Sequence, residues 1–171
     1  MTRPEFPRPV RLTPDRRDVT VEATETEREA LARRFGIIGI GALRATLRLE
    51  PEPGGSTRAR GRLSAEVEQS CVVTLDPVRQ AVEAALDLRI LEEGVLPADD
   101  DPDSPDEIES HGGLVDLGEA VAEQLALALD PYPRAAGAEL PTFDTGDEPP
   151  AEEEAPKRPN PFAGLAKLRE G

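Results

Sequence analysis

The residue types that most often carry chemistry are scarce in this sequence of 171 residues. It holds one cysteine, Cys71, and one histidine, His111. A soft metal site needs several clustered Cys or His ligands, and a single thiol cannot form an internal disulfide. The apolar neighbours of Cys71 favour partial burial, where a thiol behaves as a small hydrophobic side chain. We therefore expect no metal and no cofactor, with Cys71 as a structural residue of a strand.

Carboxylates are abundant, but their setting does not favour catalysis. The sequence has 35 Asp and Glu against 20 Lys and Arg, for a net charge of −15, and the excess of acids lies after residue 89. General acid–base catalysis needs carboxyl groups whose pKa is shifted by burial, whereas most of these lie in segments with little to bury. We expect a solvated acidic surface, which repels free nucleic acid and suits a basic partner. The sequence predicts no enzyme.

A short glycine-rich stretch, from Gly36 to Gly41, invites comparison with a phosphate-binding loop. It lacks the Lys-Ser/Thr pair of a P-loop, and its glycines do not match the dinucleotide-binding pattern. We interpret it as the end of a helix followed by the entry into a strand.

A group of arginines is the strongest candidate for a binding surface. They alternate with apolar residues in two neighbouring runs, so all of them leave one face of the predicted hairpin: Arg44, Arg48, Arg58, Arg60 and Arg62. One interpretation is contact with an RNA backbone or an acidic partner. The other, which we favour, is that Glu50, Glu66 and Glu68 on the same face pair with them as ordinary cross-strand neighbours.

The elements that hold these residues follow from periodicity and turn chemistry. Strict alternation in 42–50 and 58–68, separated by the turn PEPGGS, predicts a long antiparallel hairpin. Further strands are expected at 10–12, 18–22, 71–75 and 82–90.

Two helices are predicted from their capping residues. Thr24 with Glu27 forms a capping box for a helix that ends at Gly36, and Asp116 with Glu119 matches the same pattern for a second helix. Leu117, Val121 and Leu125 form the buried stripe of that second helix.

The fold class that results is α+β. We expect an antiparallel, barrel-like curled sheet with two helices in residues 1–136, including a mobile acidic loop at 92–113, followed by a disordered acidic linker at 137–159. No apolar run could cross a bilayer and no signal peptide is evident, so we expect a cytoplasmic protein.

The segment 160–171 is predicted to be a short linear motif. Asn160 would cap a turn of helix with Pro161 in its first position, which places Phe162, Leu165 and Leu168 on one apolar face. Such a short helix is marginal alone in water, so its apolar face must dock either on its own domain or on a partner. We favour the partner, because a long acidic linker is unnecessary for capping the core.

Three stretches together resemble the YceD-like family of large ribosomal RNA subunit accumulation proteins. The segment from Gln69 to Val78, with Cys71 and Pro77, is similar to the family's Cys-x-x-Cys-x-x-Pro; Thr74 stands in place of the second Cys. Val115, Asp116 and Leu117, followed by Val121 and Glu123, look like the Ile-Asp-Leu helix. The stretch from Asn160 to Leu168 is similar to the tail motif Asn-Pro-Phe-Ala-x-Leu-x-x-Leu.

The resemblance implies a function but no catalytic residues. It implies a cytoplasmic protein of bacteria and plastids that the large-subunit (23S) ribosomal RNA needs in order to accumulate. We expect a non-enzymatic factor for the synthesis, processing or stability of that RNA, which binds a basic ribosomal protein, an RNase or the nascent large subunit. The alternatives are a nuclease acting on precursor rRNA and a direct RNA-binding module that uses the five arginines.

Overall fold

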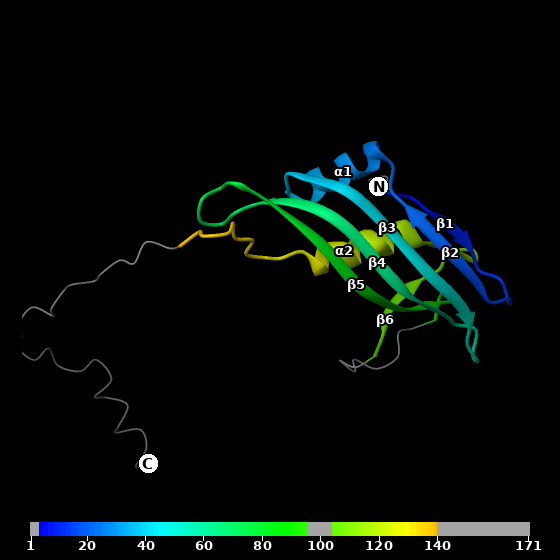
Figure 1. Ribbon diagram of the computed structural model, residues 1–171. Helices are drawn as coiled ribbons and strands as arrows, with labels where there is room; N and C mark the ends of the chain where they lie inside the picture. The colour runs from blue at the N-terminus through cyan, green and yellow to red at the C-terminus, as the bar shows by residue number, and fades with distance from the viewer. Residues whose placement is uncertain (1–3, 96–103, 140–171) are drawn as a thin grey trace, which may run out of the picture. The chain divides into compact units, whose positions relative to one another are not determined.

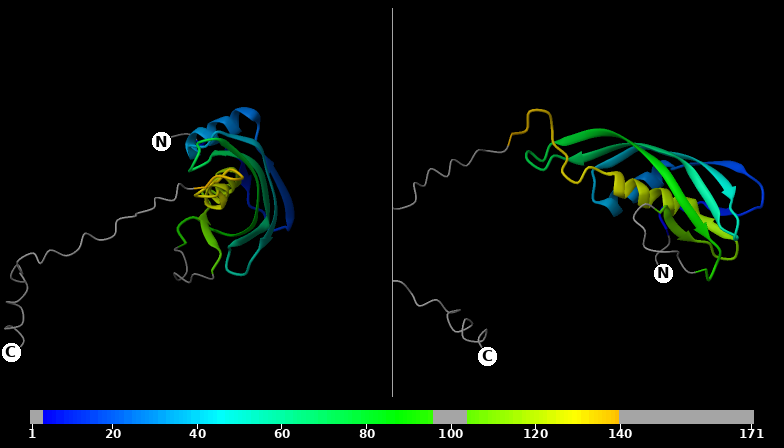
Figure 2. Two further views of the ribbon diagram at one scale, coloured as in Figure 1. Left: turned by 60° about the vertical axis from the view of Figure 1, so that its left-hand side comes forward. Right: turned by 90° about the horizontal axis from the view of Figure 1, so that it is seen from below.

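The computed structural model describes residues 4–95 and 104–139, which belong to one compact unit ending at Glu139. Most of this unit is one strongly curved sheet, with one helix at its edge and one against its concave side (Figures 1 and 2). Its elements follow one another along the chain in this order: β1 (Pro9–Arg11), β2 (Arg17–Glu22), α1 (Glu25–Phe35), β3 (Gly39–Pro51), β4 (Thr57–Ser70), β5 (Pro77–Leu91), β6 (Asp106–Glu109), β7 (Leu114–Asp116) and α2 (Leu117–Ala128).

The predicted hairpin forms the centre of the sheet. β3 and β4 pair antiparallel from Gly39 opposite Glu68 to Pro51 opposite Thr57. Alternate side chains are buried along both strands, including Leu43, Leu47 and Leu63, as the sequence pattern predicts. Because these side chains all leave the concave face, they form one half of the hydrophobic core.

Helix α2 supplies the other half of the core. The concave face of the sheet wraps around it, as the left view of Figure 2 shows. Leu117, Val121 and Leu125, the stripe predicted from helical spacing, are each fully buried. The helix therefore fills the space that the far side of a closed barrel would occupy.

The predicted barrel-like antiparallel sheet is wrong in two respects. The strand order is β2-β3-β4-β5-β6, so β2 and β6 are separate edges and the sheet does not close. β6 runs parallel to β5, with Leu88 opposite Asp106 and Leu91 opposite Glu109, so the sheet is mixed. β1 and β7 form a separate two-stranded antiparallel sheet.

Two local predictions also fail. The expected acidic loop at 92–113 contains the short edge strand β6. Its sequence does not indicate a strand, because three of the four residues are acidic and Ile108 is the one apolar side chain. The expected strand at 71–75 is instead the turn between β4 and β5, in which Leu75 adopts a φ of 64°.

The helix ends agree closely with their sequence signals. Thr24 and Glu27 form the predicted capping box, and Gly36 ends α1 in the left-handed conformation with a φ of 67°. Gly39 then opens β3 and Gly41 lies in a bulge of that strand, so the glycine-rich stretch is a helix end and a strand entry. Asp116 caps α2 by accepting from the backbone N–H groups of Gly118 and Glu119, but the Glu119 carboxylate does not complete a box. It pairs instead with Arg34 of α1.

The N-terminal segment lies directly on the first turn of α2. A Cβ atom added at Gly118 would lie 1.8 Å from the carbonyl oxygen of Phe6. Phe6 itself is fully buried. A glycine is therefore required here for the close approach of two backbones, although it sits inside a helix.

We predict that Gly118→Ala lowers the free energy of unfolding by about 1–3 kcal/mol, because the added methyl group forces the two segments apart. In an uncrowded helix the same substitution would stabilise by about 1 kcal/mol. Urea unfolding measures the difference. Gly39→Ala is the control, since a Cβ there meets nothing within 4 Å. Equal stability of the two variants would contradict the close packing at Gly118.

Candidate functional site

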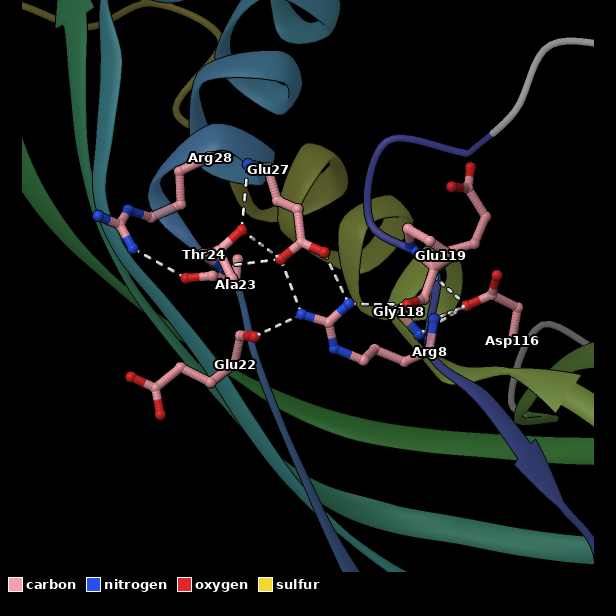
Figure 3. Close-up of polar contacts among 10 residues, drawn as sticks. Arg8, Glu22, Ala23, Thr24, Glu27, Arg28, Asp116, Gly118 and Glu119 are labelled. Carbon is pink, nitrogen blue, oxygen red and sulfur yellow. Dashed lines mark hydrogen bonds and ion pairs between the residues drawn. The ribbon is translucent and has the colours of Figure 1, made fainter.

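The N-terminal segment, α1 and α2 meet at Arg8, which lies in a group of polar contacts that joins all three (Figure 3). The guanidinium of Arg8 donates to both carboxylate oxygens of Glu27 at 2.7 Å and to the carbonyl oxygen of Glu22 at 2.9 Å. It also lies over the ring of Phe6, with Cζ 4.6 Å from the ring centre. Glu27 is the same residue that completes the capping box of α1, so one carboxylate serves a helix end and an ion pair.

The backbone of Arg8 holds the start of α2. Its N–H donates to Asp116 Oδ1 at 2.8 Å, and its carbonyl accepts from the N–H of Leu117 at 3.1 Å. Asp116 therefore caps α2 and binds the N-terminal segment with one oxygen atom. This arrangement gives Asp116 and Leu117, which carry the Ile-Asp-Leu resemblance, a structural role.

The ion pair shifts the titration of Glu27. The guanidinium of Arg8, followed in importance by hydrogen bonds from Thr24, lowers the pKa of Glu27 from 4.5 to about 2 against the opposing effect of burial. The pKa of Arg8 is raised, chiefly by its hydrogen bonds to Glu27. Both groups are therefore charged across the physiological pH range.

Cys71 is fully buried at the start of the turn between β4 and β5. Its Sγ accepts hydrogen bonds from the backbone N–H groups of Val73 and Thr74, both at 3.4 Å, and of Ala135 at 3.3 Å. The segment after α2 is thus bound to this turn, and the N–H of Val72 donates to the carbonyl of Pro133 at 2.9 Å. The expected burial of Cys71 is confirmed, but the residue belongs to a turn.

These donors favour the thiolate form of Cys71. The N–H of Ala135, and next the hydrogen bonds from Thr74, lower the pKa of the thiol from 9.0 to about 6, although burial opposes the shift. Thr74, which stands where the family pattern has its second Cys, therefore contributes a hydrogen bond to the first one.

The five arginines lie on the convex face of the sheet, opposite to α2. Arg48 stands directly opposite Arg60 and Glu50 opposite Arg58 in the register of β3 and β4, so these side chains share one face as predicted. Carboxylates of the neighbouring strands reach the same face, because Asp18 of β2 lies beside Arg48 and Asp87 of β5 beside Arg60.

Three of the five arginines are paired with carboxylates. Arg58 donates to both oxygens of Asp87, at 2.5 and 2.7 Å, and Arg60 lies 3.4 Å from the same carboxylate. Arg48 donates to both oxygens of Asp18 at 2.8 and 3.2 Å. The arginines lower the pKa of each carboxyl group; for Asp87 the main cause is Arg58 and for Asp18 it is Arg48.

The predicted partners of these arginines are wrong. Glu50 pairs with Arg16 and Glu68 with Arg79. The carboxylates that pair with the arginines come instead from β2 and β5. The side chain of Arg58 is only 11% exposed, so it is not available as a contact for RNA. Arg44 and Arg62 make no ion pair with the residues at 4–95 and 104–139.

The remaining candidate residues are more dispersed. Pro77 opens β5 on the surface, Val121 lies in the core and Glu123 is exposed on α2. The candidate partner-binding residues lie outside the described residues: Asn160, Pro161, Phe162, Leu165 and Leu168.

Within 4–95 and 104–139, no three His, Cys, Asp or Glu side chains gather as metal ligands would. Neither described helix has the length and hydropathy that a bilayer span requires.

Comparison with known proteins assigns the chain to a family. The family model described as "Large ribosomal RNA subunit accumulation protein YceD" matches residues 59–169. The chain belongs to the YceD family. No curated protein and no solved structure matches the chain.

The YceD match covers the second half of the fold. It begins at Ala59 in β4 and includes the Cys71 turn, the capped start of α2 and the C-terminal stretch. The start of the YceD match divides the arginines of the convex face. Arg60 and Arg62 lie inside the match, whereas Arg44 and Arg48 lie before it.

We predict a pH-dependent contribution of Glu27 to stability. Because the folded-state pKa is lowered, the stabilisation is complete above about pH 4.5 and is lost as the pH falls toward 2. Glu27→Gln should therefore cost about 2 kcal/mol at pH 7 and progressively less in acid. Urea unfolding across this range measures it, with Glu25→Gln in the same helical turn as the control. A cost that does not change with pH would contradict the ion pair.

We predict that Cys71 titrates well below an ordinary thiol. Thiolate absorbance in the ultraviolet should show a midpoint near pH 6, and Cys71→Ser should abolish this signal, because the chain has one cysteine. Because the folded-state pKa of Cys71 is lowered, its thiolate should stabilise the fold. The difference in free energy of unfolding between the unchanged chain and Cys71→Ser should be greatest above pH 9 and decline as the pH falls through 6. A midpoint above pH 8 would show that the three N–H donors do not hold the thiolate.

Proposed function

We propose that this protein supports the accumulation of large-subunit ribosomal RNA as a non-enzymatic factor that binds a protein or a nascent ribosomal particle. The observation that carries the proposal is the YceD match over residues 59–169, because the family is described by its role in this accumulation. The same description supports the cytoplasmic location expected from the sequence.

Charge supports binding to a basic partner. The net charge of −15 raises the rate of encounter with positively charged proteins, such as basic ribosomal proteins, and disfavours free RNA. A basic ribosomal protein, an RNase or the nascent large subunit therefore remains the proposed partner.

The convex face supports a second, narrower candidate function, which is direct contact with RNA. Arg44 and Arg62 form no ion pair among the described residues, whereas Arg48, Arg58 and Arg60 are paired with Asp18 or Asp87. An RNA contact on this face would therefore depend on Arg44 and Arg62. The C-terminal stretch with Phe162, Leu165 and Leu168 remains a proposed partner-binding motif.

Deletion of the gene tests the proposal in cells. We expect the ratio of large-subunit to small-subunit rRNA to fall, and the complete chain supplied on a plasmid to restore it. Pulse labelling of RNA then separates slower synthesis from faster decay. An unchanged ratio in the deleted cells would refute the proposed function.

Variants supplied to the same cells separate the binding modes. Arg44→Gln with Arg62→Gln tests the RNA contact, and removal of residues 157–171 tests the C-terminal motif. Glu83→Gln, a substitution of an exposed convex-face residue, is the control for altered surface charge. Purified protein with Mg²⁺ or Mn²⁺ should leave precursor rRNA intact; cleavage that persists through purification would favour the nuclease alternative.

A further inference from the structure

One side of α2 is not covered by the sheet. Its exposed residues recur at the spacing of one helical face: Glu123, Ala126, Leu127 and, just after the helix, Asp130. The left view of Figure 2 shows α2 end-on, with the concave sheet open beside it between α1 and β6. We call these four residues the α2 ridge. Leu127 is 77% exposed, the highest value among the large apolar side chains of the described residues.

A groove separates the α2 ridge from the edge strand β6. Its volume is about 290 Å³, and its apolar lining includes Ile108 and Leu127. Three carboxylates line it as well: Asp106, Glu107 and Glu123. β6 pairs with β5 on one side, and no other described strand pairs with it, so its outer edge presents backbone donors and acceptors.

A second groove lies on the other side of the α2 ridge. Its volume is about 380 Å³, and Phe35, Val72 and Leu129 contribute to its apolar lining. Gln69, which also lines it, is only 7% exposed. The Gln69 carboxamide donates through Nε2 to the carbonyl of Asp130 at 3.0 Å, but Oε1 finds no donor among the described residues.

An acceptor without a donor is costly in a buried position. Such a lost hydrogen bond destabilises a folded protein, because water bonded to the same acceptor in the unfolded chain. Gln69 is therefore a buried, unpaired acceptor in the wall of the second groove.

The charges that line the two grooves favour a positively charged occupant. Asp130 is the only ionisable group among the described residues that line the second groove, and no Lys or Arg lines either groove. The last turn of α2 contains no basic residue to offset the negative end of its dipole. The ionisable side chains that line the two grooves are therefore all acidic.

We propose that the α2 ridge and its two grooves bind a basic, extended polypeptide segment, with alternate apolar side chains in the grooves and Lys or Arg side chains against the carboxylates. This inference rests on the proposed function and deepens it by stating the site and the chemistry of the partner. A polypeptide supplies N–H donors to the β6 edge and positive side chains to Asp106 and Glu123. Neither groove is lined by a Lys or Arg that could bind phosphate, and the carboxylates would repel it, which argues against RNA as the occupant.

The experiment uses the complete chain labelled with ¹⁵N and a short synthetic peptide that alternates Lys and Val. Titration should shift the amide signals of 106–109 and 123–130 and leave those of the convex face unchanged. A peptide that alternates Glu and Val and a single-stranded RNA oligonucleotide are the comparison probes. Binding of the basic peptide on the convex face, or stronger binding of the RNA at the α2 ridge, would overturn the inference.

Two matched pairs of variants make the result specific. Glu123→Lys should weaken peptide binding tenfold or more, whereas Glu83→Lys makes the same charge change on the convex face and should alter it less than twofold. Leu127→Ser should weaken binding to a similar degree, whereas Leu75→Ser, at a residue that is 76% exposed in the β4–β5 turn, should not. Equal losses within either pair would reduce the binding to nonspecific attraction and refute the site.

The two proposals can fail separately. An unchanged rRNA ratio after gene deletion refutes the proposed function and leaves the peptide-binding result standing. No peptide shift at the α2 ridge, with a rRNA ratio that falls, refutes this site and leaves the proposed function intact.

Discussion

The ion pair between Arg8 and Glu27 is the contact on which the arrangement of the helices depends. Glu27 completes the N-terminal cap of α1, while the backbone of Arg8 binds Asp116 and Leu117 at the start of α2. The beginnings of both helices are therefore fixed to the same short segment. Because α2 fills the concave side of the sheet (Figure 2), the position of the core depends on these contacts as well.

The curvature of the sheet divides the molecule into two surfaces with different chemistry. The convex face is a network in which arginines and carboxylates from neighbouring strands largely neutralise each other, as at Arg58 and Asp87. The open side of α2 combines apolar side chains with carboxylates and lacks basic residues in its grooves. Sheet curvature thus separates a face of mostly paired charges from a face whose grooves combine apolar side chains with carboxylates.

Local signals in the sequence predicted the elements but not their connections. Alternation identified the β3–β4 hairpin, and cap residues identified both helices, because each of these signals lies within a few residues. The parallel strand β6 was missed, since three of its four residues are acidic and its pairing depends on β5. The role of Arg8 had no local signal either, because Asp116 is 108 residues away along the chain. For the convex face, alternation predicted that the arginines lie on one side of the sheet. Only the strand order shows that Asp18 and Asp87 are their partners.

The distance in sequence between Arg8 and Asp116 has a consequence for the order of events during synthesis. The hairpin of β3 and β4 can form soon after it leaves the ribosome, whereas the N-terminal segment must wait until more than 100 further residues have been made. During that interval Leu47, Leu63 and Leu88 have no helix to cover them. A chain that stalls before residue 117 would therefore display a broad apolar sheet, which is a target for chaperones and proteases. Translation must pass α2 before the protein can leave this vulnerable state.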